Sequence, residues 1–143
     1  MVKISVQTTL SRKKIYMHVV ILAGGSGTRL WPASTATKPK PFIKVGGKTL
    51  MEITLKRALT IPGVHSIITV TSESNVAYVQ KEYSVLKGTE QIGATQLEIL
   101  IEPSNQDTAA AIASAALLVK EKYSANETLL ILPSDHIIRN TDS

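Results

Sequence analysis

The chain has 143 residues, a length that suits one domain with a core of usable size. Its net charge of +5 suits anionic ligands such as triphosphates. The absence of cysteine excludes disulfides and thiolate metal sites and fits a reducing compartment such as the cytoplasm.

Residues 1–16 are predicted to be an N-terminal extension of a domain that covers 17–143. They contain no apolar stretch long enough for a signal peptide or a spanning helix, so no membrane partner is expected. The basic cluster Arg12–Lys13–Lys14 lacks aromatic neighbours. We interpret it as a solvated arm rather than a nucleic-acid site.

Residues 18–23 are almost wholly apolar, which predicts a strand covered on both faces. Glycines follow at once, at Gly24, Gly25 and Gly27. Without Cβ atoms, the backbone can approach a ligand closely and its N–H groups can converge on phosphate oxygens. Arg29 adds a forked cation and Lys40 a compact one. This segment predicts a phosphate loop for a nucleoside triphosphate.

Other glycine-rich loops fit this segment less well. A dinucleotide fingerprint needs a third glycine where Leu30 stands, and a Walker A loop needs Gly-Lys-Ser/Thr directly after it. A turn without a ligand explains the glycines alone. It explains neither Arg29 nor the pair Pro39–Lys40.

The remaining chain alternates between predicted strands and helices. Strands are expected at 66–70, 97–101 and 128–132, and helices at 50–59, 75–86 and 108–122. This order predicts an α/β fold, Rossmann-like, with a mainly parallel sheet between two helix layers. Ligands of such sheets lie beyond the carboxyl ends of the strands. Three segments should meet there: the glycine loop, Glu102–Pro103 and Pro133–Asp135.

Several polar residues have both a functional and a structural interpretation. Asp135 can hold Mg²⁺ at a strand end, or it can form an Asx turn or a helix cap. Asp107 and Thr108 are predicted first as helix caps, with base or ribose contact as their second role. His18 and His65 stand at strand starts and are interpreted as structural histidines.

The motif Gly25-x-Gly27-x-Arg29-Leu30, followed by Pro39–Lys40, resembles that of the sugar-1-phosphate nucleotidyltransferases. Further elements are similar to the mannose-1-phosphate guanylyltransferases within that superfamily. They are Trp31–Pro32 with Ser34, the Pro-Lys-x-Phe element ending at Phe42, Glu102–Ile112 and Leu132–His136. The resemblance covers residues 17 to about 138.

The sequence also departs from the family pattern. Thr35 replaces the usual Arg, and Pro41 replaces the usual Gln. Gln106, Asp107 and Ala110 stand where the family has Arg, Asn and Pro. The lost cation and the added anion make this region less favourable for phosphate.

The resemblance implies a glycosyltransferase-A-like nucleotidyltransferase fold and transfer of a guanylyl group from GTP to mannose 1-phosphate. It assigns catalytic roles to Arg29 and Lys40 and the Mg²⁺ cofactor to Asp135. It assigns nucleotide binding to Ala23, Gly24, Gly25, Ser26, Gly27, Thr28, Glu102, Pro103, Asp107 and Thr108.

The resemblance also implies a longer catalytic domain, so the chain is expected to be its truncated nucleotide-binding half. A second copy of the chain or a complementing C-terminal half would then be its partner. Two alternatives stay open: a non-catalytic nucleotide-binding or subunit-interaction fragment, and a transferase for another base or sugar.

Overall fold

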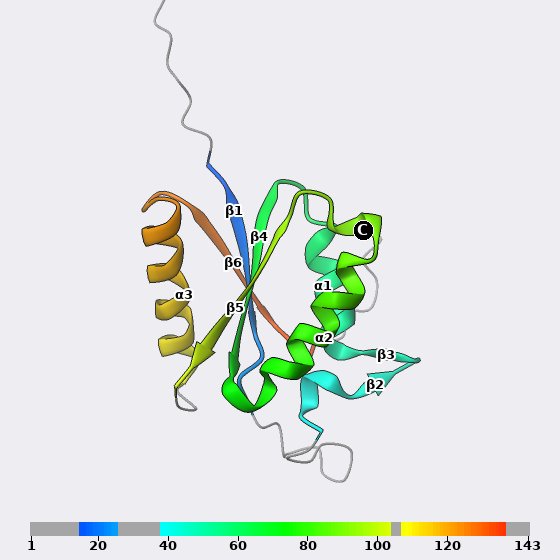
Figure 1. Cartoon of the computed structure of the whole chain (residues 1–143). Helices are drawn as coiled ribbons and strands as arrows, with labels where there is room; N and C mark the ends of the chain where they lie inside the picture. The colour runs from blue at the N-terminus through cyan, green and yellow to red at the C-terminus, as the bar shows by residue number, and fades with distance from the viewer. Residues whose placement is uncertain (1–14, 26–37, 104–106, 137–143) are drawn as a thin grey trace, which may run out of the picture.

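The computed structural model describes residues 15–25, 38–103 and 107–136. Its centre is a parallel four-stranded sheet in the order β5-β4-β1-β6 (Figure 1). The strands are β1 (Met17–Leu22), β4 (Val64–Ser72), β5 (Gln96–Glu102) and β6 (Thr128–Pro133). The α-helices of the described residues are α1 (Leu50–Leu59), α2 (Val76–Lys87) and α3 (Thr108–Lys122).

Shorter elements complete the described part of the chain. Strands β2 (Lys44–Val45) and β3 (Lys48–Thr49) form an antiparallel hairpin. The 3-10 turns are η2 (Lys40–Phe42), η3 (Glu73–Asn75) and η4 (Glu90–Ile92). Across the described residues, no helix combines the length and the apolar character needed to cross a membrane.

Strand β1 lies between β4 and β6, which explains its continuous apolar run. Val19, Val20 and Ile21 are all fully buried. Because successive side chains of a strand point to opposite faces, Val19 and Ile21 enter one core and Val20 enters the other. The apolar run therefore serves two faces at once, as the sequence predicts.

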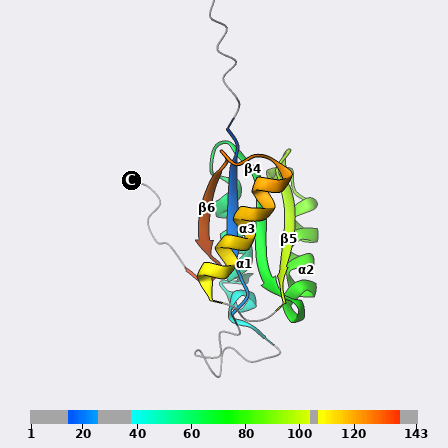
Figure 2. The ribbon, with the colours of Figure 1, turned by 90° about the vertical axis from the view of Figure 1, so that its left-hand side faces the viewer.

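The helices form two layers, one on each side of the sheet. Helices α1 and α2 cover one face, and α3 covers the other (Figures 1 and 2). Larger side chains fill the first core, among them Met51, Leu55 and Leu86. Helix α3 contributes the small residues Ala111 and Ala115 to the second core. The predicted three-layer α/β/α architecture is confirmed.

Side-chain caps begin two of the helices. The hydroxyl oxygen of Thr49 accepts a hydrogen bond from the Glu52 amide at 2.9 Å at the start of α1. The Asp107 carboxylate accepts one from the Ala110 amide at 3.1 Å at the start of α3. Both caps satisfy amides that a helix leaves without an internal partner. The predicted bounds of these two helices are confirmed.

Apart from one-residue shifts at the ends of other elements and the short 3-10 turns, the structure differs from the sequence prediction at two places. Strand β4 extends beyond the predicted 66–70, because its outer residues pair with β1 and β5 although they are not all apolar. The β2–β3 hairpin was not predicted. Its loop, Gly46–Gly47, has φ angles of 60° and 84°, which glycine adopts readily, and its strands are only two residues long.

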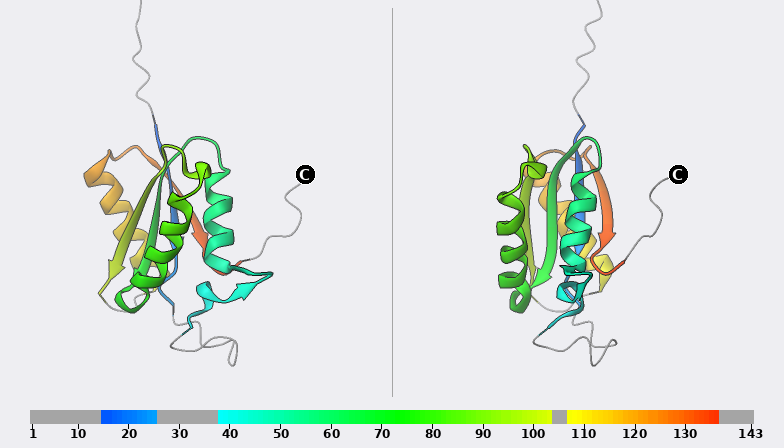
Figure 3. Two further views of the ribbon diagram at one scale, coloured as in Figure 1. Left: turned by 45° about the vertical axis from the view of Figure 1, so that its right-hand side comes forward. Right: turned by 90° about the vertical axis from the view of Figure 1, so that its right-hand side faces the viewer.

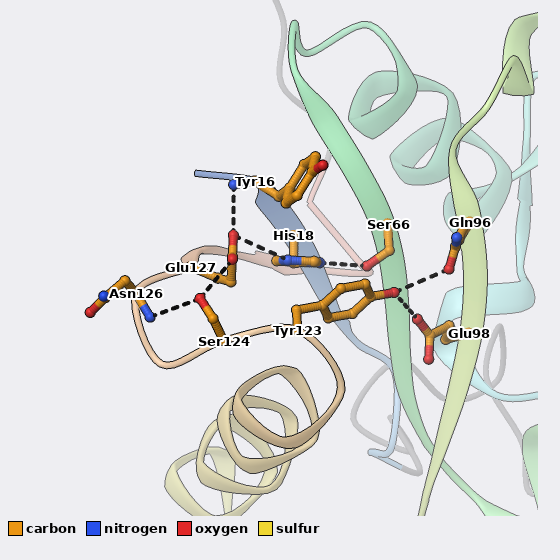
Figure 4. A network of polar contacts seen from close by, with 9 residues as sticks. All are labelled: Tyr16, His18, Ser66, Gln96, Glu98, Tyr123, Ser124, Asn126 and Glu127. Carbon is orange, nitrogen blue, oxygen red and sulfur yellow. Dashed lines mark hydrogen bonds and ion pairs between the residues drawn. The ribbon is translucent and has the colours of Figure 1, made fainter. Parts of the chain in front are cut away.

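A polar network closes the sheet at the amino ends of its strands (Figure 4). His18 is fully buried, and its Nδ1 lies 2.8 Å from the Ser66 hydroxyl oxygen. Its Nε2 lies 3.8 Å from Glu127 Oε2. Desolvation lowers the pKa of His18, although the charge of Glu127 acts in the opposite direction. His18 is therefore a structural histidine, as predicted.

Candidate active site at the carboxyl ends of the strands

The carboxyl ends of β1, β5 and β6 meet at the lower edge of the sheet in Figure 1. Backbone hydrogen bonds hold the ends together: the Ala23 amide donates to the Val70 carbonyl at 2.8 Å, and the Ser134 amide donates to the Leu22 carbonyl at 3.2 Å. The described start of the glycine loop, Gly24–Gly25, therefore lies at one edge with Glu102 and Asp135, as predicted.

A first cavity of about 280 Å³ lies at this edge, on the side of the sheet that α3 covers. The end of β1 supplies one wall, and Glu102 on β5 and the first turn of α3 supply others. Its lining residues are Leu22, Gly24, Gly25, Val70, Glu102, Asp107, Thr108 and Ala111. The lining combines apolar with polar and acidic residues, as binding sites for small molecules do.

At Gly24 the loop passes close to the end of the Glu102 side chain. A Cβ atom at residue 24 would lie 2.6 Å from Glu102 Oε2, which is closer than carbon and oxygen can approach. A Cβ atom at Gly25 would meet nothing within 4 Å among the described residues. The two adjacent glycines therefore differ: only Gly24 makes room for a neighbouring side chain.

Glu102 brings an unsatisfied acceptor to the first cavity. Its Oε1 atom is buried and has no hydrogen-bond partner in the described part of the chain. Desolvation raises the pKa of this carboxyl group. A buried acceptor without a partner is costly in a folded protein, so a donor from a ligand would stabilise it.

A second cavity, of about 160 Å³, adjoins the first and shares Leu22 and Gly25 with it. Its other lining residues are Lys40, Pro41, Ser134 and Asp135. Turn η2 carries Lys40 to this place, and the buried Phe42 anchors the turn. The fold thus brings Lys40 and Asp135 together, although they are 95 positions apart in the sequence.

Lys40 and Asp135 form an ion pair inside the second cavity. Lys40 Nζ lies 2.5 Å from Asp135 Oδ2, and each side chain is 29% exposed. Partial burial alone would raise the pKa of Asp135, but the hydrogen bond and the charge of Lys40 outweigh it and hold the pKa below its ordinary value. Asp135 is therefore an ionised carboxylate at neutral pH.

Asp135 suits a metal site in which a bound nucleotide supplies further metal ligands, rather than a site built from protein side chains alone. Nowhere in residues 15–25, 38–103 and 107–136 do three or more acidic, histidine or cysteine side chains gather as metal ligands. Mg²⁺ is commonly held by one or two carboxylates together with phosphate oxygens and water. The ionised carboxylate of Asp135 is a suitable donor of this kind.

The residues that the sequence predicts for the site fall into three groups: those that line a cavity, those that do not, and those outside the described residues. Gly24, Gly25, Glu102, Asp107 and Thr108 line the first cavity, and Lys40 and Asp135 line the second. Ala23 is buried, and Pro103 lines neither cavity. The remaining ones lie outside the described residues: Ser26, Gly27, Thr28 and Arg29.

The sequence did not predict two residues that hold the backbone of the site in position. Thr71 Oγ1 donates to the Ala23 carbonyl at 3.0 Å and fixes the start of the loop. Arg57 Nη1 donates to the His136 carbonyl at 3.4 Å and ties α1 to the segment after Asp135. The position of Thr71 at the end of a predicted strand was a usable signal. No local pattern points to Arg57.

Known proteins match this chain in sequence and in fold. Residues 18–142 match the nucleotidyl transferase family. A mannose-1-phosphate guanylyltransferase of Sinorhizobium fredii is 39% identical over 86% of the chain and 23% of its own length. The alginate biosynthesis protein AlgA of Pseudomonas aeruginosa is 41% identical over 87% of the chain and 24% of its own length.

A solved structure from Thermus thermophilus, described as a mannose-1-phosphate geranyltransferase, aligns with a TM-score of 0.61 and 29% identity. The alignment covers 88% of this chain and 34% of the other. The chain thus spans about a quarter of the length of these curated relatives. The family resemblance drawn from the motifs is confirmed, and the chain belongs to the nucleotidyl transferase family.

Proposed function

We propose that the chain supplies the nucleotide-binding part of a mannose-1-phosphate guanylyltransferase, which makes GDP-mannose and pyrophosphate from GTP and mannose 1-phosphate. The supporting observation is the pair of adjoining cavities, one with an unsatisfied acceptor and one with a cation beside a carboxylate. A nucleotide has the same division, with a base at one end and phosphates at the other.

The first cavity suits a guanine base. An ionised carboxylate only accepts hydrogen bonds, and Glu102 Oε1 has no donor among the described residues. Guanine carries an amino group and a ring N–H side by side, so one carboxylate can accept from both. Adenine and the pyrimidines of UTP and dTTP do not present this pair of donors. We assign base recognition to Glu102.

The second cavity suits the phosphates. Lys40 provides a cation at its wall, and the backbone of Gly25 provides a surface that a phosphate can approach. Mg²⁺, held by Asp135 and the triphosphate, would supply charge neutralisation at the reacting phosphate. From the family motif, Arg29 would add a second cation, although it lies outside the described residues.

In the proposed reaction, a phosphate oxygen of mannose 1-phosphate attacks the α-phosphorus of GTP. The new P–O bond forms as the bond to the β-phosphate oxygen breaks, and pyrophosphate leaves with that electron pair. The attacking oxygen is already ionised near neutral pH, so the protein needs no general base. Lys40 would therefore act by alignment and by stabilising charge.

Calorimetric titration with GTP, ATP, UTP and dTTP in the presence of Mg²⁺ tests this proposal. We expect selective GTP binding, and we expect Glu102→Gln to weaken it about thirtyfold, because a charged hydrogen bond is worth roughly 1.5–3 kcal/mol. Glu121→Gln, an exposed change on α3, is the matched control and should bind like the unchanged chain.

Three outcomes would contradict parts of the proposal. Equal affinity for all four nucleotides would remove the guanine assignment. Identical behaviour of the Glu102 and Glu121 variants would remove the role of Glu102. A folded chain that binds none of the nucleotides would favour a fragment that serves only in subunit interaction.

A further inference from the structure

A third cavity lies apart from the first two and is not used by the proposed reaction. Its volume is about 280 Å³, equal to that of the first cavity. It lies between the β2–β3 hairpin, turn η2, the start of α1 and one side of α2, elements that Figure 3 shows together. Its lining shares no residue with either of the other two cavities.

An aromatic pair forms the apolar part of this cavity. The rings of Phe42 and Tyr78 are stacked, with centroids 5.0 Å apart and an angle of 22° between their planes. Phe42 is buried, whereas Tyr78 is 37% exposed. Val85, one of the exposed large apolar residues of the described chain, lines the cavity beside them. A flat ring can stack on such a surface.

Three lysines and two glutamates line the cavity. Lys38, Lys44 and Lys81 line it, and none of them forms an ion pair with another described residue. Its two acidic residues are already engaged. Glu52 Oε1 accepts from Lys56 Nζ at 2.7 Å, and Glu82 Oε1 accepts from Thr49 Oγ1 at 2.8 Å.

These observations point to a ligand of one chemical class. An isolated surface lysine is ordinarily solvated and needs no partner. Here three lysines line one hollow that also presents an exposed aromatic ring: Lys44 on β2, Lys81 on α2 and Lys38 just before η2. The volume is near the lower end of the range for small-molecule sites, which favours a compact ligand over a peptide.

We propose that this third cavity is a second ligand site, which binds a small phosphorylated ring compound with its ring on Tyr78 and its phosphate among Lys38, Lys44 and Lys81. Turn η2 separates this site from the proposed active site. Lys40 and Pro41 of the turn line the second cavity, whereas Phe42 of the turn and Lys38, just before it, line the third.

Amide NMR of the full 143-residue chain, titrated with GMP, tests the proposal. The Gly47 and Thr49 amides report on the third cavity, and the Gly24 and Gly25 amides report on the first. We expect saturable shifts at Gly47 and Thr49. They should persist in Gly24→Ala, in which the first cavity is narrowed. Inorganic phosphate should shift the same two amides at higher concentration.

Matched variants on one helix identify the contacts. Lys81→Met should raise the Kd at the third cavity about threefold, and Tyr78→Leu about fivefold, as expected for one exposed charge and one ring contact. Lys87→Met, at the exposed end of α2 and outside the cavity, should leave the Kd unchanged.

Two results would overturn the proposal. One is that the Gly47 and Thr49 amide resonances do not shift at millimolar GMP. The other is that the Lys81 and Lys87 variants bind GMP at the third cavity with the same Kd. Failure of the proposed main function is a separate result, because it would appear as unresponsive Gly24 and Gly25 amides.

Discussion

The two ends of the central sheet use the same four strands but differ in what their polar groups face: a network of side chains at one end and cavities at the other. At the amino ends, the Tyr123 hydroxyl donates to Glu98 at 2.9 Å, and Ser124 donates to Glu127 at 2.8 Å (Figure 4). His18 Nε2 has no hydrogen bond there, but it faces Glu127 Oε2 at 3.8 Å within the same network. At the carboxyl ends, Glu102 keeps an acceptor without a partner beside a cavity.

The difference separates stability from binding in one small fold. Polar groups that are satisfied internally hold elements together and leave nothing for a ligand. An unsatisfied acceptor at a cavity costs stability but is available to a ligand, and a partly exposed ion pair at a cavity wall adds little stability. We therefore expect substitutions at the amino ends to change the free energy of unfolding, and substitutions at the carboxyl ends to change nucleotide affinity.

The largest effect is expected from His18→Ala at the amino ends. The change removes a fully buried ring and leaves the Ser66 hydroxyl without its partner. It should lower the free energy of unfolding by about 3 kcal/mol, measured by chemical denaturation. GTP affinity of the folded variant should not change. A large loss of affinity would contradict the separation of the two ends.

Lys40→Met is the corresponding change at the carboxyl ends. It should weaken binding of GTP with Mg²⁺ by about 2 kcal/mol, roughly thirtyfold, because the phosphates lose a cation. The free energy of unfolding should fall by less than about 1 kcal/mol, since the lost ion pair is partly exposed. Lys56→Met removes the ion pair with Glu52 on the surface of α1, so it controls for the loss of one positive charge away from the cavity. If both variants bound GTP equally well, Lys40 would have no role.

Gly24→Ala tests how closely the loop and Glu102 approach each other. The added methyl group would displace the Glu102 carboxylate and narrow the first cavity. We expect GTP affinity, measured by calorimetry, to fall about tenfold, which corresponds to 1.4 kcal/mol. Normal GTP binding by this variant would show that the glycine loop and Glu102 do not form one site.

The smallest effect is a pH dependence of stability from His18. Its pKa is lowered in the folded state, so the unfolded chain binds the proton more readily below the ordinary value of 6.5. The contribution of His18 to the free energy of unfolding is therefore fully present above that pH. It decreases as the pH falls, by at most about 1.4 kcal/mol per pH unit. Denaturation at several pH values should show the slope, and His18→Gln should remove it. His136→Gln, at an exposed histidine, should retain it.

The sequence predicts those parts of the molecule whose cause is local. The apolar run of β1 and the alanine-rich composition of α3 each carry their own signal, so both elements were identified. The Gly46–Gly47 hairpin was not, because its strands are too short for a periodic pattern. The pair Lys40–Asp135 was foreseen as two residues of one site, but their direct contact depends on how η2 packs against the end of β6.

The central claim is that ligand binding belongs to the carboxyl ends of the sheet. Hydrogen–deuterium exchange of the chain, with and without GTP and Mg²⁺, tests it most directly. The account predicts slower exchange at Gly24–Gly25, Asp107–Thr108 and Ser134–Asp135, and unchanged exchange at His18, Ser66 and Glu127. Equal protection at both ends, or protection confined to the amino ends, would contradict it.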